Sequence, residues 1–187
     1  MNAKVARRQF TVDDYYRMAE AGILGEDDRV ELIEGEIVQM APIGSRHAAV
    51  VDRITTLFAH LAATKEVIIR IQSPIRLSDL TEPQPDVTLL RPRADYYSGG
   101  HPTGADVLLL IEVADSSLDY DREVKLPLYA RAGVPEVWIV DLEGDAVETY
   151  TRPAATGYAV VLRVSRGESV SPGVIPSLRL TVDDILG

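Results

Sequence analysis

The fold depends on a stretch that begins Pro85-Asp86-Val87-Thr88-Leu89-Leu90 and continues as Val107-Leu108-Leu109-Leu110-Ile111-Glu112-Val113. The second piece is a continuous apolar run with one carboxylate near its end, and Asp119-Tyr120-Asp121-Arg122-Glu123-Val124-Lys125 then begins a helix. An unpaired carboxylate in a dry strand costs several kcal/mol or more unless a proton, a cation or a metal neutralises it. We therefore predict that Asp86 and Glu112 bind a divalent metal ion and that Lys125 completes the site.

The composition is that of a globular protein. With 187 residues, the chain is long enough for one sizeable core, and we predict a single domain over residues 1–187. It contains no cysteine, which excludes disulfides, Cys-ligated zinc, iron–sulfur clusters and a thiol nucleophile. The basic N-terminus is not followed by an apolar segment, and no apolar run approaches the roughly 18 residues of a membrane span. We therefore expect a cytoplasmic protein that does not contact a membrane.

The formal net charge is −10, which by itself argues against nucleic acid as a partner, because nucleic acid favours basic surfaces. The distribution of charge weakens that objection. Residues 151–179 hold four arginines and one acid, whereas residues 1–40 hold nine acids and five bases. We interpret the N-terminal third as a solvated acidic surface and leave open a locally basic face near the C-terminal end.

The pattern of apolar residues predicts an α/β fold. Thr11 and Asp14 form a capping box for a first helix, and residues 30–40 read as a β-hairpin that turns at Glu34-Gly35. Ser45 is placed to cap an amphipathic helix. The later elements are predicted as strands at 67–71, 87–90, 107–113 and 136–141, a helix at 119–132, a hairpin over 146–164, a short strand at 178–180 and a last helical turn at 182–186.

Two apolar strands that flank a helix predict a βαβ crossover. We therefore expect a mixed central sheet flanked by the helices near 45–63 and 119–132. The core would cover about residues 28–141, with an N-terminal β-hairpin, and a β-rich C-terminal extension would cover 142–187. Asp86 opens one strand and Glu112 closes another, so their carboxylates meet at one edge if those strands are neighbours and run in opposite directions. Oxygen ligands of this kind suit Mg²⁺ or Mn²⁺.

Lys125 shares a helix face with Asp121 and Tyr129, because the three residues follow a spacing of four. We expect this face to point toward the sheet, where a lysine needs a partner such as two carboxylates or a bound phosphate. The alternative is an exposed ion pair between Asp121 and Lys125 on the helix surface. Spacing alone does not choose between these two interpretations.

Several motifs together resemble the PD-(D/E)XK nuclease superfamily, and in particular its bacterial restriction-endonuclease-like family that was formerly described as a domain of unknown function. The matching features are Glu31-Leu32-Ile33-Glu34-Gly35-Glu36-Ile37-Val38, His47, Gln84-Pro85-Asp86-Val87, Glu112-Val113-Ala114, Asp121 with Lys125 and Tyr129, and Gly133-Val134-Pro135-Glu136-Val137-Trp138-Ile139-Val140-Asp141. They cover roughly residues 10 to 185, and their order and spacing make the match more specific than any one motif.

The resemblance implies a restriction-endonuclease-like core and metal-dependent hydrolysis of phosphodiester bonds in DNA. It implies that Asp86 and Glu112 bind Mg²⁺ or Mn²⁺, with the carbonyl of Val113 as a further ligand. The superfamily usually carries a lysine two residues after the glutamate, where this chain has Ala114. Lys125 matches the relocated lysine of this family, and the catalytic set would be Asp86, Glu112 and Lys125.

Three further residues are candidates for contact with the substrate or with the metal ligands. His47 matches a family position near the start of a helix, although a capping or core role suits a lone histidine equally well. Glu34 lies in a hairpin turn, where a glutamate is usually solvated, and we rank it below His47. Gln84 precedes the Pro85-Asp86 pair and is either a substrate contact or an ordinary loop residue.

Two other functions remain open at this point. The net charge of −10 is compatible with a non-catalytic module that keeps the nuclease fold and binds nucleic acid or protein. A metal-dependent hydrolase of a smaller phosphorylated substrate would also suit an acidic protein. A homodimer formed through the apolar C-terminal hairpin is expected only by analogy with nucleases that cut both strands.

Overall fold

A six-stranded mixed sheet forms the centre of the molecule in the computed structural model, which describes residues 7–25 and 27–187. The strand order is β3-β4-β5-β6-β7-β8, and only β5 and β6 pair in parallel. The strands are β3 (Ile68–Ile71), β4 (Val87–Leu90), β5 (Val107–Ala114), β6 (Glu136–Asp141), β7 (Ala146–Ala154) and β8 (Gly157–Ser165). This arrangement confirms the predicted α/β fold with a mixed central sheet.

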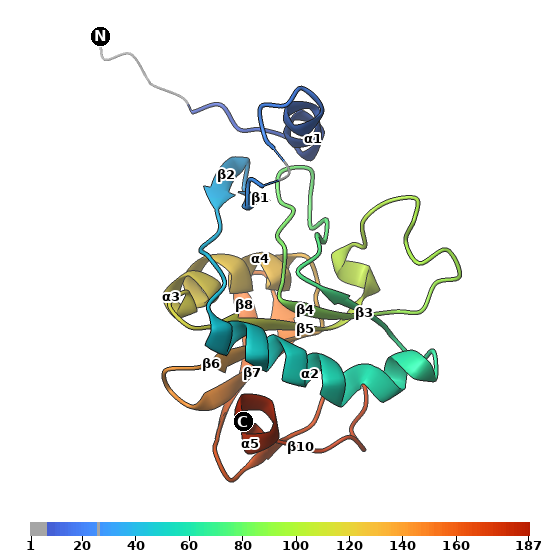
Figure 1. The fold of residues 1–187 in the computed structure, drawn as a ribbon, viewed down its shortest axis with the longest axis vertical. Helices are drawn as coiled ribbons and strands as arrows, with labels where there is room; N and C mark the ends of the chain where they lie inside the picture. The colour runs from blue at the N-terminus through green and yellow to red at the C-terminus, as the bar shows by residue number, and fades with distance from the viewer. Residues whose placement is uncertain (1–6, 26) are drawn as a thin grey trace.

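Each face of the sheet is covered by a different helix. Figure 1 shows α2 (Ser45–Ala63) along one side of the strands and α3 (Leu118–Tyr120) and α4 (Leu126–Arg131) on the other. Side chains alternate along β5, so Leu109 and Ile111 enter the core cluster that contains α2, whereas Leu110 enters the cluster that contains α4. Because β5 is buried on both faces, its sequence is an unbroken apolar run rather than an alternating one.

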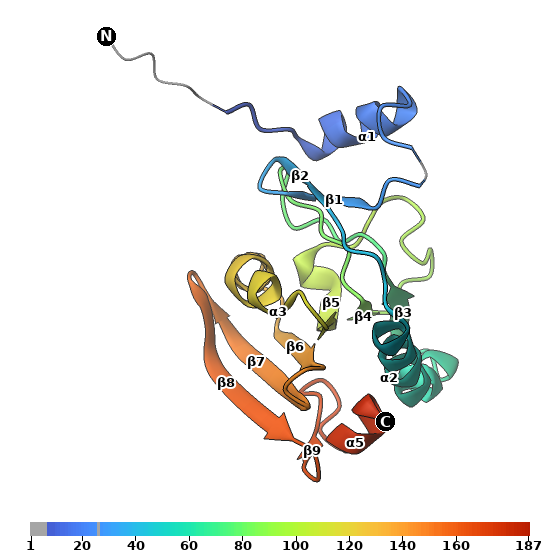
Figure 2. The same cartoon turned by 60° about the vertical axis from the view of Figure 1, so that its left-hand side comes forward.

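The N-terminal residues form a separate layer above the sheet, as Figure 2 shows. This layer consists of α1 (Val12–Glu20) and the antiparallel hairpin of β1 (Val30–Ile33) and β2 (Glu36–Gln39). Thr11 and Asp14 make the capping box predicted for α1. The hairpin is tied to the segment before β4, because Leu32 forms an isolated bridge with Glu82. The hairpin is therefore held beside the strand end that carries Asp86.

The C-terminal extension continues the central sheet instead of forming a separate unit. β7 pairs with β6, and β8 forms the outer edge. The short strands β9 (Ser169–Val170) and β10 (Leu180–Thr181) then lead into α5 (Val182–Leu186), which packs on α2. Within residues 7–25 and 27–187, the structure has no helix that is both long and apolar enough to cross a membrane.

Two local predictions were wrong. The residue that caps α2 is Gly44, and Ser45 is already the first helical residue, without a capping side-chain hydrogen bond. The predicted helix at 119–132 is not uniform, because a π-helical turn, η2 (Asp121–Lys125), separates α3 from α4. Such turns are rare and occur frequently at functional sites, and hydrophobic periodicity does not reveal them.

A capping box at the start of α5 gives a first testable prediction. The hydroxyl of Thr181 accepts a hydrogen bond from the backbone N–H of Asp184 at 3.0 Å, and the Asp184 carboxylate accepts one from the Thr181 backbone. We expect Thr181→Ala to lower the free energy of unfolding by about 1 kcal/mol in urea denaturation, because it removes a helix cap. Thr181→Ser keeps the hydroxyl and should retain nearly all of the stability. An equal loss in both variants would contradict this role.

Candidate active site

Asp86 and Glu112 meet because β4 and β5 are antiparallel neighbours. Val87 is paired with Ile111, which places Asp86, just before β4, beside the end of β5. The backbone N–H of Val113 donates to Asp86 Oδ2 at 2.9 Å, and the Asp86 backbone N lies 3.4 Å from Glu112 Oε2. The register of one strand pair therefore brings together two carboxylates that are far apart in the sequence.

Lys125 reaches the same point from the helix side. Glu112 follows Leu110 on the face of β5 that α4 covers, and the π-helical turn buries Lys125 on the side of the helix that packs on this face. The Lys125 Nζ lies 3.3 Å from Glu112 Oε1, which also accepts a hydrogen bond from the Tyr129 hydroxyl. The side chain of Lys125 is 8% exposed, so the alternative of an exposed pair with Asp121 is wrong.

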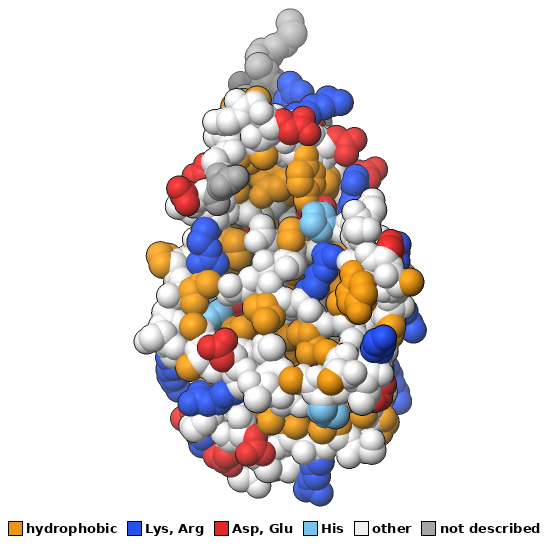
Figure 3. Space-filling model, turned by 45° about the vertical axis from the view of Figure 1, so that its right-hand side comes forward, with side chains coloured by type: hydrophobic (Ala, Val, Ile, Leu, Met, Phe, Trp, Pro, Cys, Tyr) orange, Lys and Arg blue, Asp and Glu red, His pale blue; other side chains and the backbone are white. Residues whose placement is uncertain are grey.

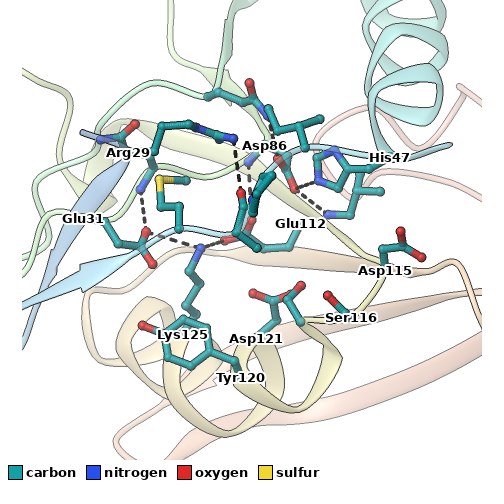
Figure 4. Close-up of a pocket in the computed structure, with 18 of the residues that line it drawn as sticks. Arg29, Glu31, His47, Asp86, Glu112, Asp115, Ser116, Tyr120, Asp121 and Lys125 are labelled. Atoms are coloured by element: carbon teal, nitrogen blue, oxygen red, sulfur yellow. Dashed lines mark hydrogen bonds and ion pairs between the residues drawn. The ribbon is translucent and has the colours of Figure 1, made fainter. Parts of the chain in front are cut away.

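A further carboxylate, that of Glu31 on β1, completes the ion pairs of Lys125. Glu31 Oε2 lies 3.4 Å from Lys125 Nζ, and it accepts a hydrogen bond from the backbone N–H of Gln84. Glu31 is 2% exposed. The hairpin therefore supplies a side chain that fixes the lysine from the side opposite to Glu112, as Figure 4 shows.

Asp86 is held by groups from two other elements. The Nε2 atom of His47, near the start of α2, lies 3.0 Å from Asp86 Oδ2, and the side-chain amide of Gln72 donates to Asp86 Oδ1. The hydrogen bond with Asp86 raises the pKa of His47, although burial of the ring opposes this effect. The remaining ring nitrogen, Nδ1, is buried without a hydrogen-bond partner among the described residues. His47 thus orients Asp86 and does not cap the helix.

These side chains line one cleft of about 310 Å³. The lining includes residues 38–44, from the end of β2 to the start of α2, and residues 115–117, 120 and 121, after β5. The volume falls at the lower end of the range for small-molecule sites. Figure 4 shows Asp86, Glu112 and Lys125 on the floor of this cleft, with Asp115, Ser116 and Asp121 along one side.

The cleft has an excess of negative charge. Burial raises the pKa of Glu112 and of Asp121, and Lys125 opposes this rise in both cases. Burial alone would lower the pKa of Lys125, but Glu112, Glu31 and Asp121 outweigh it and raise the pKa, so the ammonium stays protonated. The Lys125 ammonium is thus surrounded by four carboxylates, those of Glu112, Glu31, Asp121 and Asp86. A second cation bound among these carboxylates would stabilise their charged forms.

The oxygen atoms on the floor of the cleft are of the type that binds hard divalent cations such as Mg²⁺ or Mn²⁺. Within residues 7–25 and 27–187, no group of three or more His, Asp or Glu side chains is arranged to hold a metal ion. Mg²⁺ needs fewer protein ligands, because it usually binds one or two carboxylates and keeps several water molecules. Asp86 and Glu112 supply two carboxylates, with no thiolate or free imidazole ligand of the kind that structural zinc prefers.

The structure does not bring every predicted residue into the cleft. Gln84 lines it, and its side-chain amide donates to the carbonyl of Val30. Val113 also lines it. Glu34, in contrast, is exposed at the hairpin turn, where it forms an ion pair with Arg131 at 2.7 Å. Glu34 therefore does not line the cleft, and it is solvated, which is the alternative that a hairpin-turn position favours.

Glu31 is the residue that the sequence interpretation missed. It lies in the strand Val30-Glu31-Leu32-Ile33, where it is the single carboxylate among apolar residues. The same signal, a costly charge in a dry strand, identified Glu112 and was available for Glu31 as well.

The six-stranded sheet and this strand-end site define a restriction-endonuclease-like α/β protein. The chain belongs to the Uma2 family, described as "Putative restriction endonuclease", whose model matches residues 12–183. Membership supports a nuclease-like function. No curated protein matches the chain.

A solved structure from Anabaena variabilis ATCC 29413, described as "a putative nuclease belonging to DUF820", has a similar fold. The TM-score is 0.72 at 18% sequence identity, and the alignment covers 95% of this chain and 97% of that one. At this level of identity, the likeness shows the fold alone. The family that the sequence motifs indicated is confirmed by the match over residues 12–183.

Proposed function

We propose that this chain is a metal-dependent DNA endonuclease of the PD-(D/E)XK type. The observation that carries the proposal is the position of three side chains. Asp86 and Glu112 meet at the adjoining ends of two antiparallel strands, and Lys125 reaches Glu112 from the helix. A pair of buried carboxylates next to a buried ammonium is costly unless it serves a ligand or a reaction. Family membership supports a phosphodiester as that substrate.

Asp86 and Glu112, with the carbonyl of Val113, would hold Mg²⁺ or Mn²⁺. The metal, when bound, lowers the pKa of a water molecule and neutralises charge on the phosphate oxygens. His47 and Gln72 fix the orientation of Asp86 through hydrogen bonds to its two oxygens. A ligand that is held in this way loses less conformational freedom on binding the metal.

Lys125 would stabilise the negative charge that develops on the phosphate during hydrolysis. The superfamily's usual position for this lysine is here Ala114, which is fully buried in the cluster under α4. Residues two apart in a strand face the same side of a sheet, so Ala114 and Glu112 share a face. Lys125 approaches that face from the helix and places an ammonium beside Glu112, which supports the relocated role.

Cleavage assays test the proposal directly. Purified protein is incubated with plasmid and oligonucleotide DNA in Mn²⁺, in Mg²⁺ and in a chelator, beside Asp86→Ala as the background control. We expect cleavage by the wild type in either metal and none in the chelator. Asp86→Ala should not cut, because Asp86 is one of the two carboxylates proposed to hold the metal. Equal cleavage by the wild type and Asp86→Ala would refute the proposal.

A non-catalytic binding module is the second candidate, and the paired cations favour it. Two arginines of the C-terminal region, Arg163 and Arg166, form ion pairs with Glu148, Asp141, Asp145 and Asp183. Figure 3 shows one face of the molecule, on which Lys and Arg side chains are scattered among acidic and apolar ones. On this face no broad basic patch is seen that would favour DNA binding. Absence of metal binding, or metal binding that Glu112→Ala does not change, would select this candidate.

We also retain the homodimer as a proposal. β8 forms an edge of the central sheet, and its side chains Val161 and Leu162 are 53% and 60% exposed. An exposed apolar edge strand is a surface on which a second chain can pair. Two copies would present two clefts, as cleavage of both strands of a duplex requires.

A further inference from the structure

The depth of the candidate site restricts what can reach it. The side chains of Asp86, Glu112 and Lys125 are only 14%, 4% and 8% exposed. Residues 38–44 and residues 115–117, 120 and 121 line the same cleft around them. A phosphodiester that contacts this floor has to enter the cleft. The backbone of a continuous, fully paired duplex lies on a convex surface, which does not enter a cleft of about 310 Å³.

The charges that line the cleft also disfavour a duplex. The lining residues include five acids, Glu31, Asp86, Glu112, Asp115 and Asp121, but only two permanent cations, Arg29 and Lys125. Lys125 is engaged by its own carboxylates. Duplex binding depends on many Lys or Arg contacts with phosphates along both strands. The cleft can offer such contacts at one or two phosphates at most.

One wall is apolar and open to solvent. It consists of Val38, Met40, Ala41, Pro42 and Ile43, which we call the apolar wall. Ile43 is 40% exposed, so this wall presents an apolar surface to whatever enters the cleft. An unpaired base has a flat apolar face that gains from such a surface, whereas a base inside a duplex is already stacked.

Tyr120 also lines the cleft. Its hydroxyl is buried and bonds no group among the described residues. Burial raises its pKa to about 12, so it remains a hydrogen-bond donor at neutral pH. Because this hydroxyl is buried, it meets a ligand in the cleft only after its side chain rotates, and the assignment of the occupant rests on the floor and the apolar wall.

We infer that the cleft takes one unpaired nucleotide of a DNA strand, with its phosphate on the floor formed by Asp86, Glu112 and Lys125 and its base against the apolar wall. The substrate class is therefore single-stranded DNA, or a position where a duplex is locally open. This inference rests on the proposed function for the place of the phosphate. The place of the base depends only on the shape and the lining of the cleft.

Binding and cleavage of matched oligonucleotides test the inference. The probes have one sequence and are presented as a single strand, as a full duplex and as a duplex with a central unpaired bubble. Fluorescence anisotropy in Ca²⁺ measures binding without requiring turnover, and cleavage is followed in Mn²⁺. We expect the single strand and the bubble to bind about tenfold more tightly than the duplex, the effect of one base contact.

Ile43→Ser tests the position of the base, and Val174→Ser is the matched control. Val174 is 39% exposed in a loop and does not line the cleft. We expect Ile43→Ser to weaken single-strand binding about threefold to tenfold and to raise KM with little change in kcat, because the contact is remote from the reacting atoms. Val174→Ser should match the wild type, and Ile43→Phe should bind at least as well as the wild type.

The outcomes separate this inference from the proposed function. Equal affinity for the duplex and the single strand, or unchanged binding by Ile43→Ser, would overturn the inference. Preferential binding of the same single strand as RNA would overturn its assignment to DNA. If the single strand binds preferentially but is cut no faster than by Asp86→Ala, the proposed hydrolysis fails and the inferred occupant of the cleft is supported.

Discussion

Lys125→Met is expected to lower the free energy of unfolding by about 3–5 kcal/mol in metal-free buffer, because it leaves buried carboxylates without their cation. Lys125 Nζ lies 3.4 Å from Glu31 and 3.3 Å from Glu112, whose side chains are 3% and 4% exposed. Protonation of Glu112, whose pKa burial already raises, offsets part of the loss. Urea denaturation in the presence of a chelator measures the effect.

Lys65→Met is the matched control, since Lys65 is exposed and forms no ion pair among the described residues. Its free energy of unfolding should change by less than about 0.5 kcal/mol. Lys125→Met should also cut DNA at least about a hundredfold more slowly, the typical cost of removing one group that stabilises transition-state charge. If Lys125→Met proved as stable as Lys65→Met, the two glutamates would have to be neutral already, and the ion pairs would contribute nothing to the fold.

The fold could be predicted best for the strands that are buried on both faces of the sheet. In an α/β protein, an unbroken apolar run such as Val107–Val113 is expected to form a central strand of the sheet. The single carboxylate in that run, Glu112, is therefore visible as an anomaly without any structure. Spacing placed Lys125 on one helix face with Asp121 and Tyr129 but left open whether that face is buried, and the structure shows that Lys125 is buried.

The parts that could not be predicted depend on contacts between distant segments. Glu31 pairs with Lys125 because the hairpin is fixed beside β4 through Leu32 and Glu82, which are 50 residues apart. The local pattern of the hairpin marks Glu31 as a costly charge in an apolar strand, but it does not reveal that the partner is Lys125. The two glutamates of the hairpin could not be told apart for the same reason, since a turn glutamate and a strand glutamate three residues earlier differ in direction and not in composition.

The π-helical turn could not be predicted from the local sequence either. Apolar spacing in residues 118–131 fits an ordinary helix, and the wider turn is seen only in the bond from the N–H of Leu126 to the carbonyl of Asp121. The turn runs from Asp121 to Lys125, and both of these residues line the cleft. We infer that packing against the sheet selects it, because helix propensity alone favours the α form.

Glu112→Gln is expected to abolish the gain in the free energy of unfolding that metal binding gives, while the metal-free protein keeps its stability. Lys125→Met, in contrast, is expected to destabilise the metal-free protein. Glutamine has nearly the same shape, and its carbonyl can still accept from Tyr129 and Lys125, as Glu112 does. The substitution removes one of four crowded carboxylates. We therefore expect the free energy of unfolding in metal-free buffer to stay within about 1 kcal/mol of the wild type.

Mn²⁺ separates the variant from the wild type. For the wild type, Mn²⁺ at a hundredfold excess over its Kd should add about 2.7 kcal/mol to the free energy of unfolding, because the metal binds the folded state. Glu112→Gln should show almost none of this gain, and its cleavage rate should fall on the order of a thousandfold, corresponding to about 4 kcal/mol of lost stabilisation by the metal. Thermal unfolding with and without Mn²⁺ measures the first effect.

Glu143→Gln is the control, because Glu143 is exposed in the turn between β6 and β7 and lies outside the cleft lining. It removes the same formal charge and should keep the full response to Mn²⁺. A full response in Glu112→Gln would mean that Glu112 is not a metal ligand, and that its burial serves only to hold Lys125. Loss of the response in Glu112→Gln alone means that the buried carboxylate is retained for the metal, since the fold does not need its charge.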